Sequence, residues 1–245
     1  MTNNKYLSRL LAVVAVAMLA PLTVVAQDDE PGYTQVRTMV VKNGSIPAFL
    51  ELQKQFAEAG KAAGQSRGFW QEVRGDSSTF HVVRDLDKLA DNDVGFEPPM
   101  DSDKWQAWLQ GFGETVQSST YVILRNYPGH SIPPAEGTEL NLLLLRARTV
   151  AAGRGNDYRR WIENGLIPAL KKGNIQGFNY SRVAMGGNPD TWISATLIPN
   201  WAALDGPGLL GHLSSDEIAV LLGPSNAMVV DHEVKILRFR PDLSY

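Results

Sequence analysis

The chain has 245 residues, with 23 Lys plus Arg, 26 Asp plus Glu, four His and a formal net charge of −3. This balance lacks the basic excess with which nucleic-acid-binding proteins displace counterions, so we expect no nucleic-acid partner. Because the chain contains no cysteine, disulfides, thiolate catalysis, iron–sulfur clusters and Cys-ligated zinc are excluded.

Residues 1–26 have the order of an export signal. Lys5 and Arg9 precede an apolar run, Leu10–Ala20, and small residues lead up to Gln27. An uncleaved anchor is the alternative, because the apolar stretch counted to the cleavage site has 17 residues, the lower limit for spanning a bilayer. The small residues and the acidic residues after them favour cleavage. We therefore expect a periplasmic or secreted protein with no membrane contact after cleavage.

Residues 34–128 are predicted to form a strand, a helix, two strands, a helix and a strand. Apolar residues at helical spacing follow Ser45, with Pro47 in the first turn, and alternating or β-branched runs mark the strands. The predicted ranges are Val36–Val41, a helix from Ser45 to Gly64, Phe69–Arg74, Ser78–Arg84, a helix starting at Asp101 or Ser102, and Tyr121–Asn126.

Residues 129–139 form a Pro- and Gly-rich linker, and residues 140–243 repeat the same order of elements. Pro168 falls inside the first helix of this half, so we expect a kink or a restart there. Ser214 and Glu217 have the spacing of a capping box. The predicted ranges are Leu140–Val150, a helix containing Tyr158 and Leu170, strands at 178–185 and 190–198, a helix at 215–222, and Val229–Phe239.

The two halves also align residue by residue. Residues 35–69 match 144–178 without a gap, with six identical pairs that include Arg37/Arg146. Chance would give about two at average residue usage. In the last strands, Ile123-Leu124-Arg125 matches Ile236-Leu237-Arg238. Because the length differences lie in loops, the pattern indicates a tandem duplication.

The order β-α-β-β-α-β is the ferredoxin-like arrangement, in which both helices cover one face of an antiparallel sheet. The other face of each sheet is too apolar to be exposed to water. We therefore predict an α+β fold in which two tandem ferredoxin-like repeats pack sheet to sheet as an intramolecular α/β barrel.

The chain resembles the dimeric α/β-barrel superfamily, in particular its antibiotic-biosynthesis-monooxygenase-like and NIPSNAP-like domains. The resemblance covers 34–128 and 140–241 and is carried by Trp161 with Ile167–Leu170, by Gly177-Phe178 and by Ile236–Arg238. It implies a barrel of two four-stranded sheets whose interior or mouth takes a small, often aromatic molecule. Members include cofactor-free oxygenases of phenolic compounds, haem-degrading enzymes and proteins without an established activity. The Asn, Trp and His set of the haem-degrading members has no match here, so no functional residue carries over.

His81 is the candidate catalytic residue. It shares a predicted strand face with Thr79 and Val83. If that face lines the barrel, the imidazole is a candidate proton acceptor for a phenolic substrate; a hydrogen-bonded core histidine and a surface histidine are the alternatives. The sequence has no His-x-His or HExxH spacing, and the acids beside His232 point to the opposite strand face, so we predict no metal site.

Two further groups are candidate ligand-binding residues. Arg37 and Arg146 occupy matching positions of the two halves and either hold an anionic ligand or pair with carboxylates. Trp70, Tyr180 and Trp192 lie near the predicted hairpins and either line a pocket for a flat ligand or belong to the core.

Other motifs are interpreted as structural. Gly64–Gly68 matches the hydrolase pattern G-x-S-x-G, but the elements around it run helix then strand, the reverse of a nucleophile elbow. The acidic segment 85–103 lacks a complete calcium loop and is interpreted as solvated. Because no Gly-rich phosphate loop is present, we expect no nucleotide cofactor. We also expect no cofactor of any other kind.

The first functional hypothesis is a binding protein without dedicated chemistry, since no acid, base and nucleophile converge in the sequence. It would take a small apolar or aromatic molecule between its two sheets. The alternatives are a cofactor-independent monooxygenase or isomerase of a phenolic substrate, with His81 as base, and a structural protein with a filled barrel. The sequence does not decide the oligomeric state, and a homodimer is one possibility.

Overall fold

The computed structural model describes residues 32–93, 97–139, 141–173, 175–206 and 208–245. The predicted export signal lies outside this range. Within it, every helix is too short or too polar to cross a membrane.

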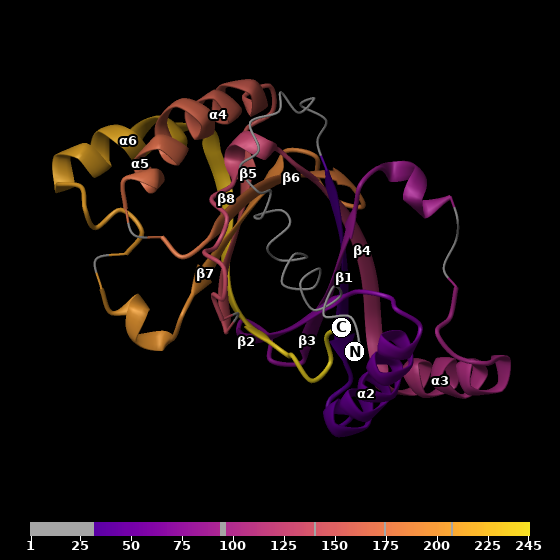
Figure 1. The fold of residues 1–245 in the computed structure, drawn as a ribbon. Helices are drawn as coiled ribbons and strands as arrows, with labels where there is room; N and C mark the ends of the chain where they lie inside the picture. Colours follow the sequence, from indigo (N-terminus) through magenta and orange to yellow (C-terminus); the bar gives the residue numbers. More distant parts are fainter. Residues whose placement is uncertain (1–31, 94–96, 140, 174, 207) are drawn as a thin grey trace.

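Eight antiparallel strands close into one barrel in the order β1-β3-β2-β8-β5-β7-β6-β4 (Figure 1). Strands β1–β4 come from the first half of the chain and form one four-stranded sheet, and β5–β8 from the second half form another. The two sheets join edge to edge at two seams, β2–β8 and β4–β6. The α+β class and the barrel agree with the sequence analysis. The bounds are β1 (Tyr33–Val41), β2 (Gly68–Arg74), β3 (Thr79–Leu86), β4 (Val116–Asn126), β5 (Leu142–Val150), β6 (Phe178–Met185), β7 (Thr191–Ile198) and β8 (Val229–Phe239).

The helices lie outside the barrel, in two groups on opposite sides (Figure 1). Helices α2 (Ile46–Ala62) and α3 (Ser102–Thr115) cover the first-half sheet. Helices α4 (Gly155–Trp161), α5 (Ile167–Lys171) and α6 (Ser215–Met228) cover the second-half sheet. A π-helical turn, Ile162–Leu166, joins α4 to α5. The restart expected at Pro168 is therefore confirmed, because α5 begins with this proline in its first turn.

Side chains alternate across the barrel wall, as strand geometry requires. On the outer face, Met39 and Phe80 pack against Phe49 of α2. On the inner face, apolar side chains of both halves meet in one cluster, so the barrel interior joins the two sheets. The buried members of this cluster are Trp70, Leu143, Leu197 and Leu237.

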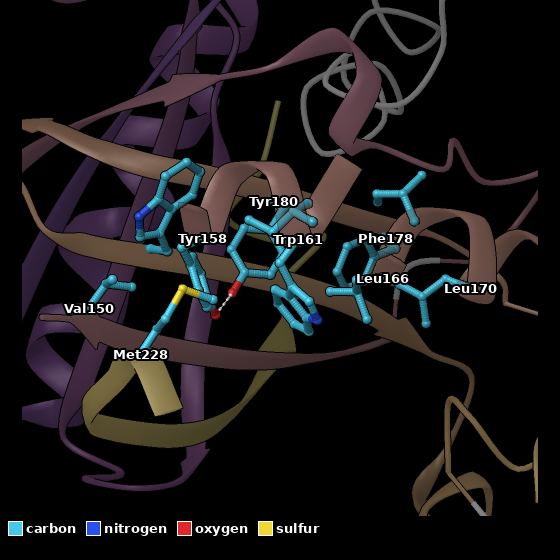
Figure 2. Packing of buried hydrophobic residues seen from close by; sticks show 11 residues of the cluster. Val150, Tyr158, Trp161, Leu166, Leu170, Phe178, Tyr180 and Met228 are labelled. Atoms are coloured by element: carbon cyan, nitrogen blue, oxygen red, sulfur yellow. Dashed lines mark hydrogen bonds between the residues drawn. The ribbon is translucent and has the colours of Figure 1, made fainter. Parts of the chain in front are cut away.

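The second half fills the space between its helices and its sheet with large side chains (Figure 2). Tyr158 of α4 and Tyr180 of β6 meet through their hydroxyls at 2.6 Å. Trp161 packs beside them and donates its indole N–H to the Leu221 carbonyl oxygen at 2.7 Å. These large aromatic side chains closely pack the space between the second-half helices and their sheet.

Several element boundaries differ from the sequence prediction, and the largest differences are at the start of β4 and the end of α6. Strand β4 begins at Val116 instead of Tyr121, because it follows α3 with no intervening loop. Helix α6 continues through Pro224 to Met228, beyond the predicted end at 222. Met228 joins the buried second-half core, and its burial stabilises the extra turn although proline removes one backbone donor.

Candidate functional site

A cavity of about 720 Å³ lies in the first half, between helices α2 and α3 and the outer face of β1, β3 and β4. We call it the first-half cavity. Sequence analysis placed the ligand between the two sheets, whereas this cavity is outside the barrel, on the helical side of one sheet. Its lining is a mixture of aromatic rings and polar side chains.

The aromatic wall comes mainly from α3. Trp105 and Trp108 stack with ring centres 5.1 Å apart and planes 10° apart. The Trp108 indole N–H donates to the Leu52 carbonyl oxygen at 3.0 Å, which fixes the ring against α2. Phe56 of α2 and Tyr245 complete the wall. Flat apolar surfaces of this kind suit a ring-shaped ligand.

Arg67 is buried beside this wall, with 7 % of its surface exposed. Its guanidinium carbon lies 4.6 Å from the Phe56 ring centre and 5.0 Å from that of Tyr245. Its Nη atoms donate to the Gln53 side-chain oxygen at 3.2 Å and to the Gln53 carbonyl oxygen at 3.1 Å. Burial lowers the pKa of Arg67 to about 10; Tyr245 opposes this shift and the charge of Arg37 adds to it.

Arg37 of β1 is the second guanidinium of the cavity. Its Nε donates to the Ser119 hydroxyl at 2.9 Å, and the group lies over the rings of Phe112 and Tyr121. Burial lowers the pKa of Arg37. Among the described residues, no carboxylate lies within 4.0 Å of Arg37 or Arg67. Both positive charges are therefore without an ion-pair partner in that part of the chain.

Three residues that line the cavity each carry a buried polar atom without a hydrogen-bond partner among the described residues. The atoms are Gln53 Nε2, Ser66 Oγ and Arg67 Nε. An unpaired buried polar atom costs about 1–3 kcal/mol, so such atoms are rare in folded proteins. Their concentration around one cavity is typical of a site whose partner arrives with a ligand.

Asp85 borders the cavity near the end of β3, but its side chain lies on the inner face of the sheet, the face of His81. There its Oδ1 accepts a hydrogen bond from the Thr34 hydroxyl at 2.9 Å. Burial raises the pKa of Asp85 to about 7, the Thr34 bond opposes the shift, and the nearby charge of Asp87 adds to it. The expectation of a fully solvated acidic segment is therefore wrong for this residue, because its side chain points into the barrel.

The structure places His81 on the inner face of the barrel, across the sheet from the Arg37 side chain. Its Nε2 lies 2.9 Å from a Glu72 carboxylate oxygen, and its Nδ1 lies 3.0 Å from the Thr38 hydroxyl. Lys235 of β8 donates to the same Glu72 oxygen at 2.9 Å. Both imidazole nitrogens are thus engaged by the protein, in a polar cluster that links the two halves.

The remaining candidate residues are spread over three places. Trp70 belongs to the inner apolar cluster. Tyr180 and Trp192 lie on the outer face of the second half, within the packed aromatic core. Arg146 lies on the outer face of β5, outside the first-half cavity. The structure therefore brings Arg37 to the cavity and does not gather the other candidates around it.

Gln53, Ser66, Arg67 and Asp85 were not singled out by sequence reasoning as site residues. One signal was available in the alignment of the two halves. At the offset of 109, Gln53, Ser66 and Arg67 are matched by Ile162, Ile175 and Gln176. Gln53 and Ser66 are polar where the aligned residues Ile162 and Ile175 are apolar, so a fold of this kind does not require polar side chains at those two positions.

No protein-family model matches the chain, and none of the curated proteins matches it significantly. Solved structures match its fold. A candidate monooxygenase from Lactobacillus acidophilus NCFM has 9 % identity and a TM-score of 0.58, over 88 % of this chain and 99 % of that one. Another from Fusobacterium nucleatum has 9 % identity and a TM-score of 0.59, over 86 % and 93 %. An anthrone oxidase-like protein has 12 % identity and a TM-score of 0.59, over 87 % and 92 %. At these identities the chain is similar to them in fold alone.

Proposed function

We propose that the first-half cavity binds a small, flat, aromatic molecule. The observation that carries this proposal is the set of three unpaired polar atoms around a cavity with stacked indole rings. A purely structural role would leave those atoms without compensation, at a cost the fold has no reason to bear. The wall supplies ring contacts, and the polar atoms fix the orientation of the ligand.

The comparison of the two halves supports the same proposal. We infer that the halves arose by duplication, since each has the order β-α-β-β-α-β and the same order of strands in its sheet. In the second half the corresponding region is packed by Tyr158, Trp161 and Ile162. In the first half, by contrast, the matching region contains the first-half cavity.

The experiment is a titration with N-phenyl-1-naphthylamine, a neutral aromatic probe, followed by probe emission and by tryptophan quenching. We expect saturable binding, because Trp105 and Trp108 line the cavity. The double variant Gln53→Ile with Ser66→Ile copies the second-half residues and should weaken binding at least tenfold. Arg146→Met, outside the cavity, is the matched control and should bind normally. Equal binding by the double variant would contradict the proposal.

A second candidate function is acid–base chemistry inside the barrel, in a cofactor-independent oxygenase or isomerase. The observation that favours it is Asp85, whose side chain points into the barrel beside Thr34 and whose pKa of about 7 suits a proton acceptor near neutral pH. Two of the matching solved structures are described as candidate monooxygenases and a third as anthrone oxidase-like. Asp85 takes the role that sequence analysis gave to His81.

Anthrone tests this second candidate. Its methylene carbon loses two hydrogens, dioxygen supplies the new carbonyl oxygen, and the second oxygen atom leaves as water with those hydrogens. Formation of anthraquinone and oxygen uptake are both measured. A rate above the spontaneous one that falls at least tenfold in Asp85→Asn supports the enzyme. A rate unchanged by that substitution rejects Asp85 as the base, and a rate equal to the protein-free rate rejects an anthrone-oxidising activity.

We further propose that the chain acts outside the cytoplasm, from the signal-like order of residues 1–26. The check is N-terminal sequencing of the protein purified from its source. A start at Gln27 supports cleavage and export, and a start at or near Met1 contradicts cleavage.

A further inference from the structure

We propose that the molecule bound in the first-half cavity is an aromatic acid whose anionic group is held by the guanidinium of Arg67, with Arg37 adding its charge. This inference rests on the proposed function and names the chemical class of the ligand.

The first step is the charge balance of buried groups. Glu72, the other strongly buried charge, has a cation at 2.9 Å in Lys235 and a second partner in His81. Arg67 is nearly as buried, but its protein partners are the neutral Gln53 and the faces of aromatic rings. The fold gives its buried carboxylate a counter-charge, whereas its buried guanidinium has no carboxylate within 4.0 Å among the described residues. Burying an unpaired charge is costly, so an anion in the cavity would restore the balance.

The second step is the kind of atom left unpaired. Gln53 Nε2, Ser66 Oγ and Arg67 Nε are all capable of donating a hydrogen bond, and Gln53 Nε2 and Arg67 Nε can do nothing else. A site with this excess of donors requires a ligand rich in acceptors. A carboxylate or similar oxyanion offers several acceptor lone pairs and fits the edge of a guanidinium with two parallel bonds.

The third step is the direction in which Arg67 remains open. Rings of Phe56 and Tyr245 lie 4.6 and 5.0 Å from the guanidinium carbon and engage the group as a cation. Gln53 accepts one hydrogen bond from each Nη atom, which leaves the second N–H of each Nη atom unused by Gln53. The Nε–H has no partner at all among the described residues. These N–H groups lie beside the aromatic wall, so that ring and acid group belong to one ligand.

The buried acid at this end of the sheet, Asp85, does not oppose the assignment. Strand pairing of Gly68 with Val83 puts Arg67, just before Gly68, at the same end of the sheet as Asp85. The Asp85 side chain, however, lies on the inner face with His81 and binds Thr34 there. An anion bound on the outer face would therefore be separated from this carboxyl group by the sheet.

The experiment uses two probes with the same ring system. 8-Anilinonaphthalene-1-sulfonate carries an anion, and N-phenyl-1-naphthylamine lacks it. Wild-type protein should bind the anionic probe at least tenfold more tightly than the neutral one. Arg67→Met should weaken the affinity for the anionic probe about tenfold or more and change the affinity for the neutral probe less than twofold. Arg146→Met, the control, should change neither.

Arg37→Met provides a second variant, because Arg67 also contacts Gln53 and its replacement can disturb the fold. Circular dichroism and the melting temperature are measured for each variant. If Arg67→Met does not fold, Arg37→Met replaces it in the test, and weaker binding of the anionic probe with unchanged binding of the neutral probe supports the inference. Equal losses of both probes in a folded variant would overturn the inference, as would an anionic probe that binds no better than the neutral one. Failure of the neutral probe to bind the wild type at all would contradict the proposed function instead, so the two failures are distinguishable.

Discussion

Arg67 and Tyr245 are joined by two backbone hydrogen bonds, from the Arg67 N–H to a Tyr245 oxygen at 2.6 Å and from the Tyr245 N–H to the Arg67 carbonyl oxygen at 3.0 Å. Ser244 strengthens the contact by accepting a bond from the Phe69 N–H at 2.9 Å. The segment after β8 is thereby fixed against the start of β2. One wall of the first-half cavity is consequently supplied by residues that follow the second half.

Substitution of Gly60 tests this wall. A Cβ atom at Gly60 of α2 would overlap the Tyr245 ring. Gly60→Ala should therefore destabilise the protein by about 1–3 kcal/mol despite the better helix propensity of alanine, and it should weaken probe binding. Gly113→Ala in α3 is the matched control, because a Cβ there has open space and should be neutral or slightly stabilising. Urea denaturation measures both, and combining Gly60→Ala with Tyr245→Ala should remove most of the cost of Gly60→Ala.

The raised pKa of Asp85 predicts a pH-dependent stability. Between the ordinary value of 3.8 and about 7, the folded protein holds a proton that the unfolded chain releases. Stability should thus fall as the pH rises from about 4 to about 7, by as much as about 4 kcal/mol. Asp85→Asn should remove this part of the dependence and be at least as stable as wild type at pH 7. The exposed Asp103→Asn is the control; a wild-type profile unchanged by Asp85→Asn would refute the prediction.

The Glu72 cluster should contribute to the joining of the two halves. Burial favours a higher pKa for Glu72, but hydrogen bonds from His81, Lys235 and the Asp76 N–H outweigh it and lower the pKa below 4.5. The stabilisation is present above pH 4.5 and is lost as the pH falls through the lowered value. Glu72→Gln should cost about 3 kcal/mol at pH 7, because Lys235 loses its main partner.

The control for this substitution is Glu233→Gln, which removes the exposed second partner of Lys235 at 3.3 Å. It should cost less than about 1 kcal/mol. Thermal denaturation at pH 7 measures both variants, and similar costs would show that burial of Glu72 is unimportant.

Two serines before helices give a matched test of capping. Ser214 accepts a bond from the Glu217 N–H, and the Glu217 carboxylate reaches back to Ser214, so the box predicted from the sequence is confirmed. Ser45 precedes α2 in the predicted position but makes no side-chain cap bond. Ser214→Ala should cost about 1 kcal/mol and Ser45→Ala a few tenths at most, by urea denaturation. A larger cost at Ser45 would contradict the assignment.

The fold was predictable because its determinants are local. Strand β8 has the predicted bounds, Val229–Phe239, since valines begin it and the apolar Ile236 and Leu237 lie near its end. The site was not predictable by the same means. Whether Asp85 is solvated depends on the closure of the barrel around its side chain, and whether His81 is free depends on Glu72 and Thr38 from neighbouring strands. Periodicity assigns a residue to a face but does not show what occupies the space in front of it.

Closure at the β2–β8 and β4–β6 seams has a consequence for fragments of the chain. Cutting within residues 135–138 and producing the two pieces apart would expose two unpaired strand margins on each. The unpaired backbone N–H and C=O groups of those strands would form hydrogen bonds with other molecules, so each piece alone should self-associate or precipitate. Mixed together, the pieces should assemble one-to-one, since each carries the hydrogen-bonding complement of the other.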